Sequence, residues 1–153
     1  MDPSAYFLPD AADVTHLSAW SAIIPASARI IRTNLFGDAF MLDEGGAVHM
    51  LERGACCVEQ IAPAEEDFWK RLQQDEDGWQ LRPLVDECRL AGKVLGAGQC
   101  YAFITPPVFR EGSYAVENVG VASWKEWFSF TADLFQNLRG LPDGAKMTFE
   151  VTD

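Results

Sequence analysis

The segment AFMLDEGGAVHML, residues 39–51, places two short apolar runs on either side of the acidic, glycine-rich turn 43–46. Glycine supplies the positive φ that a tight hairpin turn requires, so this pattern predicts two antiparallel strands. A second turn at 52–54 and a further strand at 56–61 extend the hairpin into an antiparallel meander. The β-prone residues 29–32 precede it, and the turn 34–38 joins them to the first strand of the hairpin.

Helical periodicity appears on both sides of this meander. We expect helices at 14–24, from Pro63 to the acidic run 75–78, and at 82–90. A longer helix follows Ser123, which forms a capping box with Glu126. Further strands are expected at 100–104, within 114–121 and at 146–151. Together these elements predict an α+β fold, an antiparallel sheet with helices packed on one face, as one domain over residues 1–153.

Charge is the most unusual property of the composition. The 12 Lys and Arg against 23 Asp and Glu give a net charge of −11. So acidic a surface repels nucleic acid and anionic lipid and attracts cations or basic partners. We therefore expect no direct nucleic-acid binding. A purely solubilising role for the acidic surface stays open, because net charge also keeps proteins soluble.

The N-terminal residues Met1-Asp2-Pro3-Ser4 contain neither a basic region nor an apolar core of the kind that a secretory signal needs. The sequence also contains no apolar run long enough to span a membrane. We therefore expect a cytoplasmic protein that makes no contact with membranes.

No motif for catalysis, metal binding or cofactor binding stands out. The two histidines lie in no nucleophile or metal motif, and the four cysteines form no C-x-x-C pair, so buried and reduced thiols fit best. The glycines Gly92, Gly96 and Gly98 precede a strand and lack the Gly-Lys-Ser/Thr ending of a phosphate loop, which indicates a turn. The sequence predicts no enzyme, no metal site and no cofactor.

Two acidic segments are candidates for contact with a basic partner. The run Asp75, Glu76 and Asp77 lacks the ligand spacing of a calcium loop, so it is either a solvated helix end or a binding surface. The second segment follows Pro106-Pro107 and carries an aromatic residue between two acids: Glu111, Tyr114 and Glu117. Tyrosine is enriched at interface centres, although Tyr114 would equally suit the core of a strand.

A set of short motifs in a fixed order is similar to a known family. Its members are Trp20, Phe36-Gly37-Asp38-Ala39-Phe40, Gly46-Ala47-Val48-His49, Ile61-Ala62, Glu66-Asp67-Phe68, Gly98-Gln99-Cys100-Tyr101-Ala102-Phe103, Pro106-Pro107, Tyr114, Glu117-Asn118 and Leu141-Pro142-Asp143-Gly144-Ala145-Lys146. The chain resembles the Tdi-type family of type VI secretion immunity proteins over residues 20–146. It departs from the family at 109–112, where a Leu-Gly-Gly turn is more usual.

The resemblance implies a cytoplasmic antitoxin that binds and neutralises a cognate secreted toxin, often a nuclease. A nuclease needs a basic surface for phosphates, and a partner with a net charge of −11 would be steered onto it. The residues expected at the contact are Asp75, Glu76, Asp77, Glu111, Tyr114 and Glu117.

Two other functions stay open at this point. The first is a small-ligand-binding or regulatory domain without catalytic activity, whose pocket would be lined by Trp79, Tyr101, Phe103 and Trp127. The second is an enzyme of unrecognised type, which would require a cleft that brings His49 together with a thiol or a carboxylate.

Overall fold

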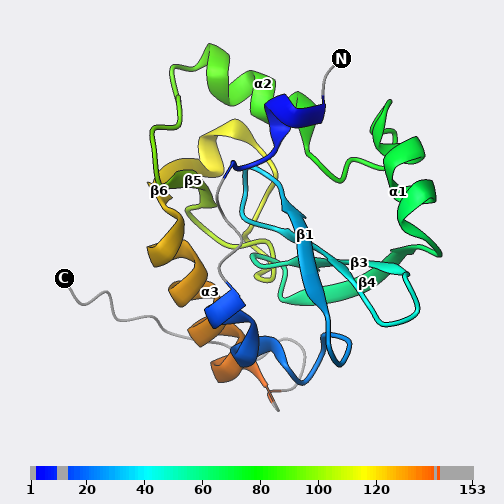
Figure 1. Ribbon diagram of the computed structural model, residues 1–153. Helices are drawn as coiled ribbons and strands as arrows, with labels where there is room; N and C mark the ends of the chain where they lie inside the picture. The colour runs from blue at the N-terminus through cyan, green and yellow to red at the C-terminus, as the bar shows by residue number, and fades with distance from the viewer. Residues whose placement is uncertain (1–2, 10–13, 140, 142–153) are drawn as a thin grey trace.

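The computed structural model describes residues 3–9, 14–139 and 141. Figure 1 shows an antiparallel sheet near the centre of the molecule with helices around it. In chain order the elements are the 3-10 helices η1 (Pro3–Tyr6) and η2 (Val14–Trp20), strands β1 (Arg29–Thr33), β2 (Ala39–Leu42), β3 (Val48–Glu52) and β4 (Cys57–Ala62), helices α1 (Glu65–Leu72) and α2 (Arg82–Leu90), strand β5 (Gln99–Phe103), 3-10 helix η3 (Val116–Asn118), strand β6 (Val119–Ser123) and helix α3 (Trp124–Leu138).

Among the residues that the structure describes there are two sheets, and the predicted meander forms the larger, with the strand order β1-β2-β3-β4 and antiparallel pairing throughout. The β2–β3 hairpin closes as expected at Gly46, whose φ of 89° is in the left-handed region. The smaller sheet pairs β5 with β6 and contains no strand of the meander.

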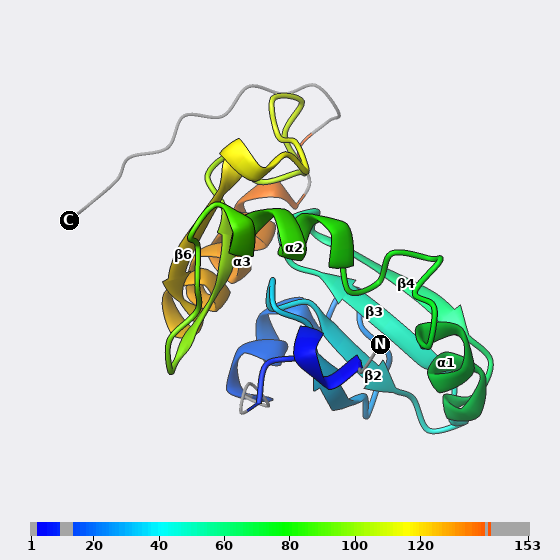
Figure 2. The same cartoon turned by 90° about the horizontal axis from the view of Figure 1, so that it is seen from above.

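Alternation along the central strands directs side chains to both faces of the larger sheet. Phe40 and Met50 point to one face, where they pack against Phe68 and Leu72 of α1. The opposite face packs against η2 and against Phe135 of α3. Figure 2 shows α1 and α3 at opposite ends of the molecule with the larger sheet between them. Because both faces of the larger sheet are covered, the central strands β2 and β3 carry apolar side chains on both faces.

The smaller sheet, α2 and the first half of α3 enclose a second core, which is rich in aromatic side chains. The Phe36 ring stacks on Phe103 with centroids 5.1 Å apart. The indole Nε1 of Trp127 donates to the backbone oxygen of Phe36 at 3.0 Å. This bond fixes the turn between β1 and β2 against α3.

A buried polar cluster joins the turn between β1 and β2 to the end of β3 and to α3. The Asp38 carboxylate accepts hydrogen bonds from Asn34 Nδ2 at 3.2 Å and from the backbone N–H of Arg53 at 3.0 Å. The fully buried Arg53 donates from Nε to the Gly37 oxygen at 2.6 Å, and its guanidinium lies 3.7 Å from the centroid of the Phe128 ring. A Cβ on Gly37 would clash with that ring, and the φ of Gly37 is 82°, so this close approach needs glycine.

The structure confirms an α+β fold built on antiparallel strands, and the bounds of α2 match the prediction. The larger sheet is covered on both faces instead of one. Three further details differ. Residues 14–20 form a 3-10 helix instead of an α-helix, the region 114–121 includes η3 before β6 begins, and α3 begins after Ser123 without a hydrogen bond from the capping side chain. The strand expected at 146–151 lies outside the described residues. Within the described residues, no helix is long and apolar enough to cross a membrane.

Candidate functional site

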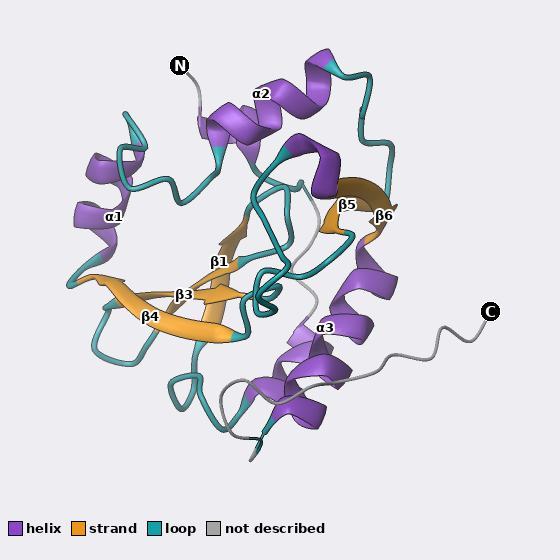
Figure 3. Ribbon diagram, turned by 180° about the vertical axis from the view of Figure 1, so that it is seen from behind, coloured by secondary structure: helices purple, strands orange, loops and turns teal. Residues whose placement is uncertain are grey.

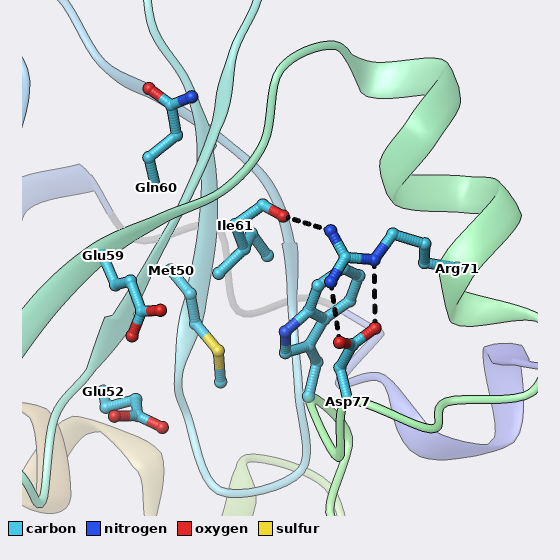
Figure 4. Close-up of a pocket in the computed structure, with 8 residues that line it drawn as sticks. Met50, Glu52, Glu59, Gln60, Ile61, Arg71 and Asp77 are labelled. Atoms are coloured by element: carbon cyan, nitrogen blue, oxygen red, sulfur yellow. Dashed lines mark hydrogen bonds and ion pairs between the residues drawn. The ribbon is translucent and has the colours of Figure 1, made fainter.

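An open groove of about 410 Å³ lies where the rim of the larger sheet meets the segment after α1. Figure 4 shows its lining residues. They are Met50, Glu52, Glu59, Gln60, Ile61, Arg71, Asp77 and Trp79. Met50 and Trp79 are buried and provide an apolar floor, while the charged residues are at the sides.

Strand pairing places two acids together on this groove. Met50 pairs with Glu59 and Glu52 pairs with Cys57, and residues paired across antiparallel strands share a face. Glu52 and Glu59 are therefore diagonal neighbours on the face of the sheet that carries Met50. Neither forms an ion pair with a residue in the described part of the chain. This side of the groove presents two carboxylates that are available to a cation.

The other side of the groove is closed by an ion pair. Arg71 of α1 binds Asp77 through two hydrogen bonds, from Nη2 at 2.7 Å and from Nε at 3.2 Å. Its Nη1 donates to the backbone oxygen of Ile61 at 2.9 Å, and its guanidinium lies 4.9 Å from the Trp79 ring centroid. The hydrogen bond with Asp77 raises the pKa of Arg71 above its usual range. Asp77, one of the predicted contact residues, thus lies at the groove with its charge already paired.

The prediction that Asp75 contacts a partner is wrong, because Asp75 is buried and its side chain stabilises the turn between α1 and α2. Its carboxylate accepts from the backbone N–H groups of Trp79 at 2.9 Å and Gln80 at 3.0 Å, and Arg82 Nε lies 3.9 Å away. Burial raises the pKa of Asp75. A partner protein cannot reach a side chain enclosed in this way, so Asp75 is a structural residue. Its neighbour Glu76 is exposed.

Tyr114 is half-exposed, at 49 %, and lies in a loop instead of in a strand. Its ring meets the edge of Phe103 with centroids 5.3 Å apart. Burial raises the pKa of Tyr114 to about 12, and the negative charge of Glu52 adds to this effect.

Backbone contacts hold the loop that carries Tyr114 against the β3–β4 turn. The N–H of Val108 donates to the Gly54 oxygen at 3.0 Å. A Cβ on Gly54 would lie 2.9 Å from Pro107 Cδ, so the proline ring packs directly on the Gly54 backbone. The predicted residues Glu111 and Glu117 are exposed, but no contact ties them to the groove.

The residues expected for a ligand pocket do not surround one cavity. Tyr101, Phe103 and Trp127 are packed in the core between the smaller sheet and α3, with exposed fractions of 6 % or less. Trp79 belongs to the core of the larger sheet and lines the groove. This arrangement contradicts the pocket that the sequence suggested for these four residues.

His49 does meet a carboxylate, as the enzyme hypothesis required. Its Nε2 lies 2.8 Å from Asp43 Oδ2, and Asp43 also accepts the backbone N–H of Ala47. These bonds lower the pKa of Asp43 below its usual range. Because both bonds close the β2–β3 hairpin, the turn itself accounts for the pair, and neither residue lines the groove.

The cysteines and acids gather into no metal site that the structure describes: no group of three or more His, Cys, Asp or Glu in residues 3–9 and 14–139 is placed to hold an ion. Cys88 and Cys100 are buried as predicted, whereas Cys57 is exposed on the groove face of β4. Although the residue is exposed, partial desolvation of its sulfur raises the pKa of Cys57 to about 12, and the hydrogen bond to Glu52 adds to this effect. Cys57 is therefore an uncharged thiol at neutral pH. The negative charge on this face of β3 and β4 comes from Glu52 and Glu59.

Sequence reasoning missed Glu52 and Glu59, although strand alternation was the signal that could have found them. No local pattern in the sequence could have identified Arg71, since its contact with β4 depends on how α1 packs on the sheet. Comparison of the chain with protein-family models, with curated proteins and with solved structures found no match in any of the three.

Proposed function

We propose that this chain is a cytoplasmic immunity protein that binds a basic toxin domain of a type VI secretion system and neutralises it without catalysis. The observation that carries the proposal is the acidic side of the groove, Glu52 and Glu59, together with the half-exposed Tyr114 on the loop that is bonded to the β3–β4 turn. Interfaces of tight complexes combine an aromatic anchor with complementary charge, and this face offers both.

Electrostatics favours a basic partner over a neutral one. The net charge of −11 attracts a cationic protein from a distance. At the groove, the carboxylates of Glu52 and Glu59 form no ion pair with a described residue and can bind its cationic side chains. A nuclease toxin fits this description, because it must carry cationic side chains to hold phosphates. In this proposal the chain protects the producing cell by occupying the toxin surface.

The proposal is tested by coexpressing the chain with the product of the adjacent gene. We expect the two proteins to copurify as a one-to-one complex of about nanomolar affinity, about −12 kcal/mol, since a few toxin molecules suffice to kill a cell. An unrelated basic nuclease domain of similar charge is the control and should not copurify. Absence of a complex with every neighbouring gene product, or turnover of a metabolite by this chain alone, would contradict the proposal.

Tyr114 offers a local prediction on the same complex. Replacement by alanine removes a ring that is half-exposed and supported by Phe103, and we expect about tenfold weaker binding. The conservative Tyr114→Phe change keeps the ring and should lose less. Isothermal titration of both variants measures the effect, and equal affinity of Tyr114→Ala and the unchanged protein would place the contact elsewhere.

A further inference from the structure

The larger sheet ends at β4, and no strand that the structure describes pairs with the outer side of β4. Figure 3 shows β4 at the rim of the sheet. An edge strand presents unpaired backbone N–H and C=O groups that can pair with another chain. Proteins often protect such edges with lysine or proline, and residues 57–62 contain neither.

The alternation of hydrogen-bonded residue pairs along the strands shows which backbone groups of β4 point away from β3. The Asp43 N–H donates to the Ala47 oxygen at 3.0 Å at the mouth of the β2–β3 hairpin. Bonded and non-bonded pairs alternate along an antiparallel ladder, so the odd-numbered residues of β3 bond to β2. Met50 and Glu52 therefore direct their backbone groups to β4.

The partners of Met50 and Glu52 on β4 are Glu59 and Cys57, which use their backbone groups in the sheet. Val58 and Gln60 must then direct theirs outward. No other segment that the structure describes forms a backbone hydrogen bond with Val58 or Gln60. The alternation ends after Gln60, where a register shift lies opposite Val48 and His49, and the Ile61 carbonyl at this irregularity accepts a hydrogen bond from the Arg71 guanidinium.

The acids beside this edge select the kind of strand that can pair with it. Glu59 lies at the middle of β4 and is exposed, with Glu52 diagonal to it. Antiparallel pairing of two copies of β4 about its middle would bring the Glu59 side chains of the two copies together, and like charges directly opposite destabilise a sheet. A strand with cationic side chains would instead place them beside both carboxylates. Charge thus disfavours self-association and favours a basic occupant.

We propose that a basic, extended segment of the partner protein adds a strand to β4, with its backbone bonded to Val58 and Gln60 and its cationic side chains beside Glu52 and Glu59. This inference rests on the proposed function and names the way in which the toxin is bound. Main-chain bonds supply affinity in such strand addition, and alternate side chains supply specificity. The groove floor of Met50 and Trp79 receives the stems of those cationic side chains.

The test uses the full chain labelled with ¹⁵N and a short peptide of alternating lysine and threonine. We expect the peptide to slow amide hydrogen exchange at Val58 and Gln60, and to do so less as salt rises. A peptide of alternating glutamate and threonine is the matched probe and should protect neither amide. In Glu52→Lys/Glu59→Lys, binding of the basic peptide should weaken about tenfold.

Substitution at Gln60 separates backbone pairing from side-chain contact. Gln60→Pro removes an outward N–H without removing a bond to β3, so protection at Val58 should disappear while the fold persists. Gln60→Ala keeps the N–H and should behave like the unchanged protein.

Four results would each overturn strand addition. They are protection that survives in the proline variant, equal protection by the acidic peptide, binding of the basic peptide without slowed exchange, and no binding of that peptide. Concentration-dependent protection of the same amides in the chain alone would also overturn it, and would assign the edge to a second copy. A toxin that copurifies although the peptide test fails would leave the proposed function standing and remove only this docking mode.

Discussion

Replacing Asp38 with alanine is expected to lower the free energy of unfolding by about 3 to 4 kcal/mol. The substitution removes the acceptor of the Arg53 backbone N–H and of Asn34 Nδ2 within a buried cluster. Leaving a buried donor without its acceptor costs about 1 to 3 kcal/mol, and the buried Arg53 charge also loses a nearby carboxyl group. Urea denaturation followed by tryptophan fluorescence measures the change.

Asp38 also gives the protein a defined pH dependence. Burial, with a further contribution from Glu52, raises the pKa of Asp38 from 3.8 to about 7 in the folded state. The folded state therefore binds a proton more tightly than the unfolded state does, so the stabilisation from this group is complete below about pH 4. It is lost as the pH rises through about 7. Asp38→Asn cannot titrate and should remove this decline in unfolding free energy between pH 4 and 7.

A matched control distinguishes burial from the mere loss of a carboxylate. Asp133→Asn removes an exposed carboxylate from α3 and should leave the decline in place. If Asp38→Asn and the unchanged protein show the same slope of unfolding free energy against pH from 4 to 7, the raised pKa of Asp38 is wrong. A loss below about 1 kcal/mol in Asp38→Ala would show that the cluster is solvated or rearranges.

Local patterns predicted the parts of the fold that local physics controls. The hairpin at Gly46 and the bounds of α2 followed from glycine turns and apolar periodicity. The division of the strands into two sheets did not, because nothing within β5 or β6 says which strand it pairs with. Arg53 shows the same limit: beside a turn glycine it suggests a solvated residue, yet the packing of Phe128 and Gly37 buries it completely.

The candidate site was predictable only in part for a related reason. The acidic run after α1 supplied Asp77, which lines the groove, but also Asp75, whose left-handed backbone with a φ of 47° lets its carboxylate turn inward and bind two N–H groups. The composition predicted that acidic residues contact a basic partner, but it could not predict which acidic residues do so. Glu52 and Glu59 become neighbours only through the register of β3 and β4.

Reversal of two charges should have the largest effect on binding. In Glu52→Lys/Glu59→Lys the net charge changes from −11 to −7, because each substitution adds two units (−11 + 4 = −7). We expect the association rate constant with the toxin to fall about a hundredfold at low salt, since steering of oppositely charged proteins raises rates by about 10–10³. Its dependence on salt should also become shallower. Stopped-flow mixing at several salt concentrations measures both quantities.

The decisive comparison is with a variant of equal net charge. Glu87→Lys/Asp133→Lys reverses two exposed acids on α2 and α3, away from the residues that line the groove, and also gives −7 (−11 + 4). If steering depends on overall charge alone, both double variants slow association equally. If the groove is where the toxin docks, only Glu52→Lys/Glu59→Lys should also speed dissociation, because a charge in direct contact acts on the bound complex and a distant one acts mainly on the encounter. Unchanged association and dissociation in the groove variant would exclude this face as the binding surface, and equal effects on dissociation in both variants would exclude a contact local to Glu52 and Glu59.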